Sequence, residues 1–176
     1  MRKNAFRLIC VLAVFAAVLL GGCGTGKVVE YDDDLRAEGE ELVFSFELEQ
    51  PDEQGQPRKV SVCVSTEKDY IVCRIGTKDN MELVFPERHA GSWGKFTYES
   101  RMSIGSSGYA LEYLSFDKDK SSYKIFESYS GDDSYIGISV KNKATGDEDD
   151  LVGLKEGVKG GLMKIKLEKY PVNTVP

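Results

Sequence analysis

The sequence predicts an all-β fold: a single antiparallel β-sandwich or barrel of about 8–9 strands with meander connections. Short segments in which apolar and polar residues alternate recur along the chain, as half-buried strands require. No segment after residue 22 keeps the 3.6-residue period of a helix. Short polar connections separate neighbouring segments, and sequential hairpins of this kind favour a meander.

The β-domain is predicted to span residues 42–170, followed by an extended tail at 171–176. Its first strand begins after Glu41, where an apolar residue occupies every second position. Loops rich in Gly, Pro and charged residues separate the later segments. The further predicted strands are 59–65, 70–75, 81–85, 95–101, 109–116, 122–129, 134–141 and 161–167, with a short strand at 151–154.

Residues 1–22 have the organisation of a secretory signal peptide. Arg2, Lys3 and Arg7 supply a positive region, and an uncharged apolar run follows over 8–20. That run is shorter than the about 20 residues that a membrane-spanning helix needs. Two small residues then precede Cys23, whose thiol can be acylated.

The segment Leu20-Gly21-Gly22-Cys23 resembles the lipobox of bacterial lipoproteins, with Gly21 where the family more often has Ala or Ser. The resemblance implies that Cys23 is the mature N-terminus and carries acyl chains, which anchor the protein at about 0.8 kcal/mol per buried CH₂. Gly24 follows instead of Asp, which implies the periplasmic face of the outer membrane in a Gram-negative host. An ordinary secretory signal with an incidental cysteine is the alternative.

Residues 23–41 are rich in Gly and acidic side chains, and we predict that they form a flexible tether after the lipidated cysteine. The formal net charge of the whole chain is −6. Residues 1–22 carry three of the 23 Lys and Arg and none of the 29 Asp and Glu, so the remainder has a net charge of −9. An acidic protein of this kind has no electrostatic footprint for nucleic acid.

Two cysteines, Cys63 and Cys73, remain in the predicted domain. A hairpin with its turn centred on Lys68 places them directly opposite each other on neighbouring strands. Opposed residues approach closely enough for a disulfide, and exported proteins fold where disulfides persist. A cross-strand bridge is therefore predicted, with two buried free thiols as the alternative. Two cysteines and one distant histidine are too few ligands for a zinc site.

The sequence contains no catalytic motif: its single histidine, His89, has no partner at metal-ligand spacing. No cofactor or metal is predicted. Glu82, Glu112 and Glu127 lie on different predicted strands and are interpreted as outward-facing residues, although two of them in one cleft would suit a carbohydrate hydrolase. The acidic run at 147–150 is interpreted as a solvated loop, with a calcium site as the alternative.

Aromatic and small polar residues gather between 92 and 113, a combination suited to contacts with a protein or a glycan. The predicted binding surface comprises Trp93, Ser106, Ser107, Tyr109 and Tyr113. In the alternative interpretation, Trp93 caps one end of the domain instead. The sequence therefore predicts a membrane-anchored, non-enzymatic binding module, with an envelope structural protein as a further alternative.

The segment Ser107-Gly108-Tyr109-Ala110-Leu111 resembles the Ser-Gly-x-x-Tyr inhibitory loop of the inhibitors of c-type lysozyme, with Leu111 where Tyr is expected. Those inhibitors are small, often lipidated antiparallel β-barrels, and their Trp-x-Lys-Gly motif is absent here. The resemblance implies lysozyme as a partner. The segment 69–86 is similar to a strand-turn-strand segment of uncharacterised bacterial proteins, which implies no function.

Overall fold

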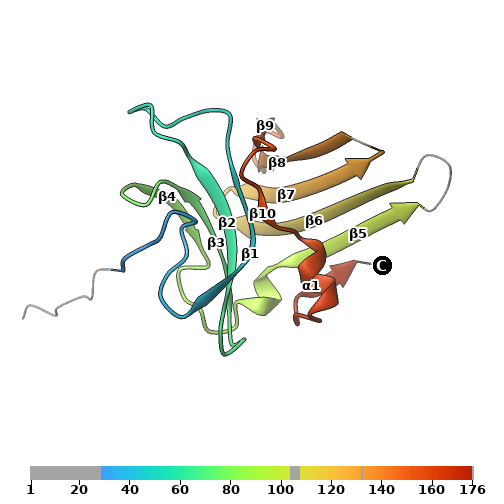
Figure 1. Cartoon of the computed structure of the whole chain (residues 1–176), viewed down its shortest axis with the longest axis horizontal. Helices are drawn as coiled ribbons and strands as arrows, with labels where there is room; N and C mark the ends of the chain where they lie inside the picture. The colour runs from blue at the N-terminus through green and yellow to red at the C-terminus, as the bar shows by residue number, and fades with distance from the viewer. Residues whose placement is uncertain (1–28, 104–107, 132, 176) are drawn as a thin grey trace, which may run out of the picture.

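Two β-sheets pack face to face in the computed structural model, which describes residues 29–103, 108–131 and 133–175 (Figure 1). The five-stranded sheet has the order β10-β1-β2-β3-β4, and the six-stranded sheet has the order β11-β5-β6-β7-β8-β9. Neither sheet closes into a barrel. The predicted all-β sandwich is therefore confirmed, and the barrel alternative is wrong.

The strands follow the predicted segments closely as far as β8. Their bounds are β1 Glu40–Glu47, β2 Lys59–Ser65, β3 Ile71–Gly76, β4 Met81–Phe85, β5 Thr97–Ser103, β6 Tyr109–Lys118, β7 Ser121–Ser130 and β8 Asp133–Asn142. The later elements are β9 Glu148–Val152, β10 Lys159–Gly160, the helix α1 Met163–Leu167 and β11 Asn173–Val175, and a 3₁₀ helix, η1 Trp93–Lys95, precedes β5.

The connections are mostly those of a meander, as predicted. Strands β1 to β4 pair antiparallel in sequence, and so do β5 to β9. The chain then returns to the five-stranded sheet, where β10 pairs with β1, and crosses back so that β11 runs parallel to β5. The predicted tail at 171–176 thus contributes an edge strand.

The core lies between the sheets and is built mainly from alternate residues of the longer strands, as the period of two requires. Val60, Val62 and Val64 supply the β2 side. Phe85 and Phe96 are part of an aromatic group in which ring centroids lie 4.4–5.4 Å apart. Such offset and edge-on pairs add to the stabilisation from buried area.

The segment 161–167, predicted to be a strand, instead contains α1. Leu162 and Ile165 are buried three residues apart, which is helical spacing, whereas Leu167 is 74% exposed. The apparent alternation of Met163, Ile165 and Leu167 was therefore misleading. No helix in the part of the chain that the structure describes is long and apolar enough to cross a membrane.

The acidic run predicted to be a solvated loop belongs mostly to β9. Lys141 pairs with Glu148 in the β8–β9 register, and Val140 pairs with Asp149. Successive side chains of a strand point to opposite faces, so these carboxylates do not converge. Among the described residues, no group of three His, Cys, Asp or Glu is placed to hold a metal ion.

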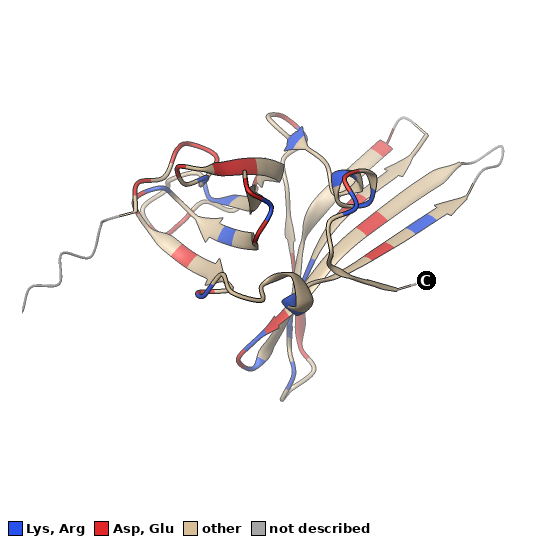
Figure 2. Cartoon of the chain, turned by 90° about the horizontal axis from the view of Figure 1, so that it is seen from below, with Lys and Arg blue, Asp and Glu red and all other residues tan. Residues whose placement is uncertain are grey.

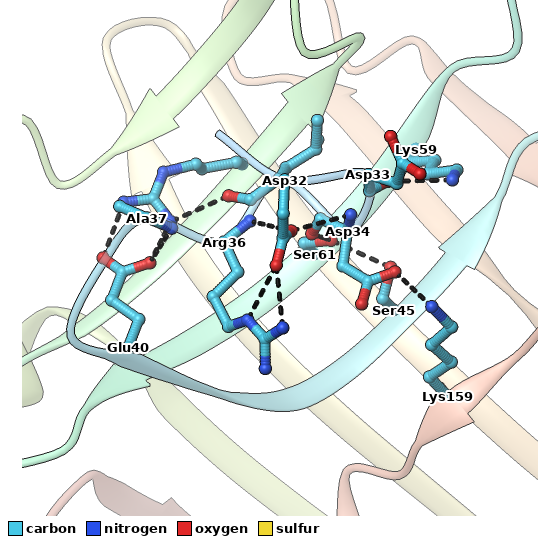
Figure 3. Close-up of polar contacts among 12 residues, drawn as sticks. Asp32, Asp33, Asp34, Arg36, Ala37, Glu40, Ser45, Lys59, Ser61 and Lys159 are labelled. Atoms are coloured by element: carbon cyan, nitrogen blue, oxygen red, sulfur yellow. Dashed lines mark hydrogen bonds and ion pairs between the residues drawn. The ribbon is translucent and has the colours of Figure 1, made fainter. Parts of the chain in front are cut away.

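Residues 29–39, which we call the strap, pack against the five-stranded sheet and are not extended as a tether (Figure 3). Leu35 is 1% exposed, and the Lys59 and Ser61 side chains of β2 donate hydrogen bonds to the carbonyl oxygens of Asp33 and Asp34. Lys159 of β10 pairs with Asp34 at 2.7 Å. The predicted tether therefore does not extend over the described residues 29–41.

A buried ion pair between β1 and β3 also holds the strap by hydrogen bonds to its backbone. The guanidinium of Arg74 on β3 contacts both carboxylate oxygens of Glu40, at 2.6 and 2.7 Å, and donates to the carbonyl oxygen of Leu35. Burial alone would raise the pKa of Glu40, but hydrogen bonds from Arg74, the Ala37 N–H and Tyr70 lower it below its ordinary value. The charge of Glu40 is thus fully compensated.

The predicted Cys63–Cys73 disulfide is wrong: both cysteines are buried free thiols. In the hairpin, Cys63 pairs with Val72 and Val62 pairs with Cys73, so the two sulfurs point to opposite faces. The turn is centred between Glu67 and Lys68, half a residue earlier than assumed. Cys73 enters the core, whereas Cys63 lies on the face that the strap covers.

Candidate functional site

The six-stranded sheet extends beyond its partner sheet at the end where β5 and β7 finish (Figure 1). We call this region the projecting end; its last rows pair 101–103 with 109–111, 128–130 and 133–135. Four of the seven large apolar side chains exposed in the described chain lie here. They are Met102 (53% exposed), Tyr109 (45%), Tyr129 (46%) and Tyr135 (65%).

Both faces of the projecting end carry these side chains. Met102 and Tyr129 lie on the face that continues the core, beyond the point where the other sheet covers it. Tyr109 and Tyr135 lie on the opposite, outer face, as does the half-buried Tyr113. Aromatic side chains of this kind supply large, rigid contact area at low entropic cost, so the region suits a binding surface.

Charges are sparse at the projecting end, most of whose ribbon is uncharged in Figure 2. Arg101 is neutralised by Glu99, whose carboxylate lies 2.6 Å from the arginine Nε. Lys124 and Lys155 place their ammonium groups 5.1 and 5.6 Å from the ring centroids of Tyr113 and Tyr135. Cation–π contacts of this kind hold the rings without removing them from solvent.

The structure brings together only part of the predicted binding surface. Tyr109 and Tyr113 share the outer face of β6. Trp93 lies before the start of β5, whereas Tyr109 pairs with Ser103 at its end. The strand itself is about 20 Å long at 3.3 Å per residue, so the two side chains lie at opposite ends of it. Trp93 stacks on Tyr170 at 5.4 Å and packs against the core, as the capping alternative predicts.

The remaining predicted surface residues, Ser106 and Ser107, lie outside the described residues, as does Cys23. Sequence reasoning missed Met102, Tyr129 and Tyr135. The signal that could have located the two tyrosines is their position on either side of the turn at 130–133, where strands end. Tyr129 and Tyr135 both fit the ordinary alternation of a strand, so alternation alone does not predict that their side chains are exposed.

Two of the three candidate carboxylates come together beneath the projecting end. Glu112 of β6 and Glu127 of β7 are directly opposed and are 0% and 1% exposed, whereas Glu82 on β4 pairs with Arg58 at 2.6 Å elsewhere. The prediction that they face outward is wrong for Glu112 and Glu127. A hydrolase needs its carboxylates in contact with substrate, and both are closed to solvent in this fold.

Burial, and to a smaller extent the neighbouring carboxylate of Glu112, raise the pKa of Glu127 above its ordinary value. Burial and a hydrogen bond to Glu127 raise the pKa of Tyr129 to about 12. The hydroxyl of Tyr129 therefore remains a donor to Glu127 at physiological pH. Through this bond, an exposed side chain of the projecting end is connected to a buried acid.

A polar groove of about 480 Å³ crosses the outer face of the same sheet, at the opposite end from the projecting end. Its acidic residues are already neutralised: Glu148 lies 3.7 Å from Lys141, and Asp117 lies 3.5 Å from Lys143. The lining residues Lys95 and Lys124 take part in none of the ion pairs among the described residues, so the groove carries a slight excess of positive charge.

Searches against known protein families, curated proteins and solved structures find no match to this chain.

Proposed function

We propose that the chain is a lipid-anchored, non-enzymatic binding module of the bacterial cell envelope. In this proposal, acyl chains on Cys23 hold the domain on the periplasmic face of the outer membrane, and the projecting end contacts a protein partner. The observation that carries the binding role is the concentration of exposed Met102, Tyr109, Tyr129 and Tyr135 at one end of one sheet. Aromatic and methionine side chains are enriched at the centres of protein interfaces.

A protein partner is favoured over a glycan for this surface. Apolar side chains stand on both faces of the projecting sheet, which suits insertion between two walls of a cleft. Apart from Asp133, the few nearby charges are neutralised internally or lie over aromatic rings, so recognition depends mainly on apolar area. Burying such area contributes about 25 cal/mol per Å².

The binding role is tested by crosslinking and capture from envelope extract with the full-length protein in detergent. The variant Tyr109→Ser/Tyr135→Ser should lose the captured partner, while Leu167→Ser, which removes an exposed apolar side chain from α1, should retain it. Equal capture by both variants would exclude the projecting end as the contact surface. Such a result would leave the anchoring proposal standing.

The anchoring proposal has its own test. Cys23→Ser should release the protein from the membrane fraction and remove the acyl mass, whereas Cys63→Ser should do neither. Unchanged acylation in Cys23→Ser would contradict the lipobox interpretation.

Inhibition of c-type lysozyme is a second candidate function. It is favoured by the exposed Met102 and Tyr109 side chains, near the end of β5 and at the start of β6. A sheet end that carries exposed apolar side chains suits an enzyme cleft. The protein should then inhibit c-type lysozyme stoichiometrically, and Tyr109→Ser should weaken that inhibition. An unchanged rate of cell-wall lysis at excess inhibitor would exclude this candidate.

A further inference from the structure

The polar groove on the outer face of the six-stranded sheet runs across the strands. Two rows of outward-facing side chains form its floor, and the register places the members of each row on neighbouring strands. The first row is Thr97, Ser115, Lys124 and Ser139, and the second is Asp117, Ser122, Lys141 and Glu148. Neighbouring strands lie about 4.8 Å apart, so a groove over β5 to β9 is about 19 Å long and suits an extended ligand of several units.

The floor is dense in hydrogen-bonding groups that can accept further bonds. The Ser122 hydroxyl donates to Asp117 at 2.5 Å, and the Ser139 hydroxyl donates to Glu148 at 2.6 Å. A hydroxyl that donates one bond keeps two acceptor lone pairs, and a carboxylate offers about four acceptor positions. A ligand rich in hydroxyl groups matches this floor, because each of its hydroxyls can donate to these acceptors.

The positive charge of the groove is concentrated in the part nearer β5. Lys95, at the end of η1, and Lys124 take part in none of the ion pairs among the described residues. Toward β9, Lys141 lies 3.7 Å from Glu148, and the exposed Asp150 pairs with Ser139 in the β8–β9 register. An anionic group bound in the part of the groove nearer β5 would therefore face two ammonium groups that no neighbouring acid pairs with.

A row of apolar side chains borders the floor on the side toward the projecting end. Tyr113, Phe126 and Val152 belong to it, with Gly137 between the last two. The Phe126 ring lies over Gly137, where an added Cβ would come within 2.5 Å of the ring Cζ atom. The ring is half-buried, so part of it remains open to solvent. Aromatic rings of this kind pack against the apolar C–H faces of sugar rings, whose hydroxyls can then reach the polar floor.

We propose that the groove binds a glycan that carries carboxylate groups. The two unpaired lysines bind a carboxylate, the rest of the floor binds sugar hydroxyls, and the Phe126 row packs against the sugar rings. A neutral glycan would leave Lys95 and Lys124 without an anionic partner, and an acidic peptide lacks the hydroxyls that match the floor. This site is separate from the projecting end and does not depend on the binding role proposed there.

Titration calorimetry tests the site with the full-length protein in a nonionic detergent. The probes are two acidic sugars, tetragalacturonate and a hyaluronan tetrasaccharide, and two comparators, cellotetraose and tetraglutamate. Cellotetraose has sugar rings without charge, and tetraglutamate has charge without sugar rings. Each exposed lysine contact contributes about threefold to affinity, so at least one acidic sugar should bind about tenfold more tightly than either comparator. Failure of both acidic sugars to bind, or equal binding of either comparator, would overturn the proposal.

Two lysines provide a matched pair of variants. The ammonium groups of Lys124 and Lys155 lie 5.1 and 5.6 Å from the ring centroids of Tyr113 and Tyr135, but only Lys124 lines the groove. Lys124→Gln should weaken binding of the acidic sugar about threefold, and Lys95→Gln/Lys124→Gln should weaken it about tenfold. Lys155→Gln should leave the affinity unchanged, and equal weakening by Lys124→Gln and Lys155→Gln would contradict the site.

The projecting end provides a second control. Tyr109→Ser/Tyr135→Ser, the variant designed to lose the protein partner, should keep the wild-type affinity for the acidic sugar. Loss of sugar binding in this variant would place the sugar at the projecting end and overturn the groove as its site. Because the calorimetry contains no protein partner, failure of the capture assay and failure of sugar binding are separate outcomes.

Discussion

The protein buries charge in two places and compensates it in two ways. On the outer side of the five-stranded sheet, Glu40 is neutralised by Arg74, whose guanidinium contacts both of its oxygens. On the inner side of the six-stranded sheet, Glu112 and Glu127 face each other and are held by neutral donors alone. The first arrangement helps to hold the strap in place, whereas the second contains no cation among its hydrogen-bond partners.

The two arrangements respond to pH in opposite directions. The pKa of Glu40 is lowered by folding, so its contribution to stability is present above the unfolded pKa and is lost as pH falls through the folded value. The pKa of Glu127 is raised, so its contribution is present below the unfolded pKa and is lost as pH rises through the folded value. The Glu40–Arg74 pair thus stabilises the fold above the unfolded pKa of Glu40, whereas the burial of Glu127 favours the fold most at acid pH.

The largest expected effect follows from removing the cation of the first arrangement. Arg74→Met should lower the free energy of unfolding by about 3–5 kcal/mol, because it leaves Glu40 buried without a counter-charge. Urea denaturation of the full-length protein in detergent measures this change. The double variant Glu40→Met/Arg74→Met should lose less than Arg74→Met alone, since it removes both charges.

A half-exposed ion pair provides the control for this prediction. Arg58→Met breaks the pair with Glu82, whose side chain is 32% exposed, and should cost at most about 1 kcal/mol. Equal losses in Arg74→Met and Arg58→Met would show that burial of the ion pair does not determine its contribution.

Removing one acid of the second arrangement should have a smaller effect of the opposite sign. Glu127→Gln should raise the free energy of unfolding by about 1 kcal/mol at pH above the folded pKa of Glu127, because it replaces an acid whose ionisation is disfavoured by burial with a neutral amide. The gain should shrink as pH falls and Glu127 of the wild type takes up a proton. Denaturation curves measured over a pH series test this dependence, and a gain that increases toward acid pH would contradict it.

The smallest effect concerns the two thiols, because Cys63 lies under the strap beside the Glu40–Arg74 pair and Cys73 lies in the core. Burial, followed by the charge of Glu40, raises the pKa of Cys63 to about 12, and burial also raises the pKa of Cys73. Neither thiol should react with iodoacetamide in the native protein. In Arg74→Met, alkylation of Cys63 should become faster, because the strap loses its bond from Arg74 to Leu35, while Cys73 should remain protected in the core. Mass spectrometry of the alkylated protein distinguishes the two sites.

The sequence predicted most strands correctly, because the alternation of apolar and polar residues can be seen within each segment alone. It located β1 to β8 and the all-β class, since each strand alternates within itself, but it did not distinguish a sandwich from a barrel. It failed wherever the outcome depended on register or on a distant partner. A shift of half a residue in the β2–β3 turn separated Cys63 from Cys73, and the strap is ordered by β2 and β3, far from it in the sequence.

The candidate site shows the same limit. Glu112 and Glu127 were recognised as acids that distant strands could bring together, but their inward orientation depends on which face of β6 the other sheet covers. Leu114 and Phe116 on the same face as Glu112 contained that information. The exposure of Met102 and Tyr129 could not be predicted in this way, because it depends on how far the six-stranded sheet extends beyond the five-stranded sheet.

The folding of the strap also determines how the domain would stand on a bilayer. Under the proposed anchoring, Cys23 is separated from Val29, the first described residue, by a stretch of chain that reaches at most about 20 Å when fully extended. The strap, in blue in Figure 1, lies on the opposite side of the molecule from the projecting end. The contact surface would therefore face away from the bilayer. It would bind only partners that come within about the height of one domain of the membrane.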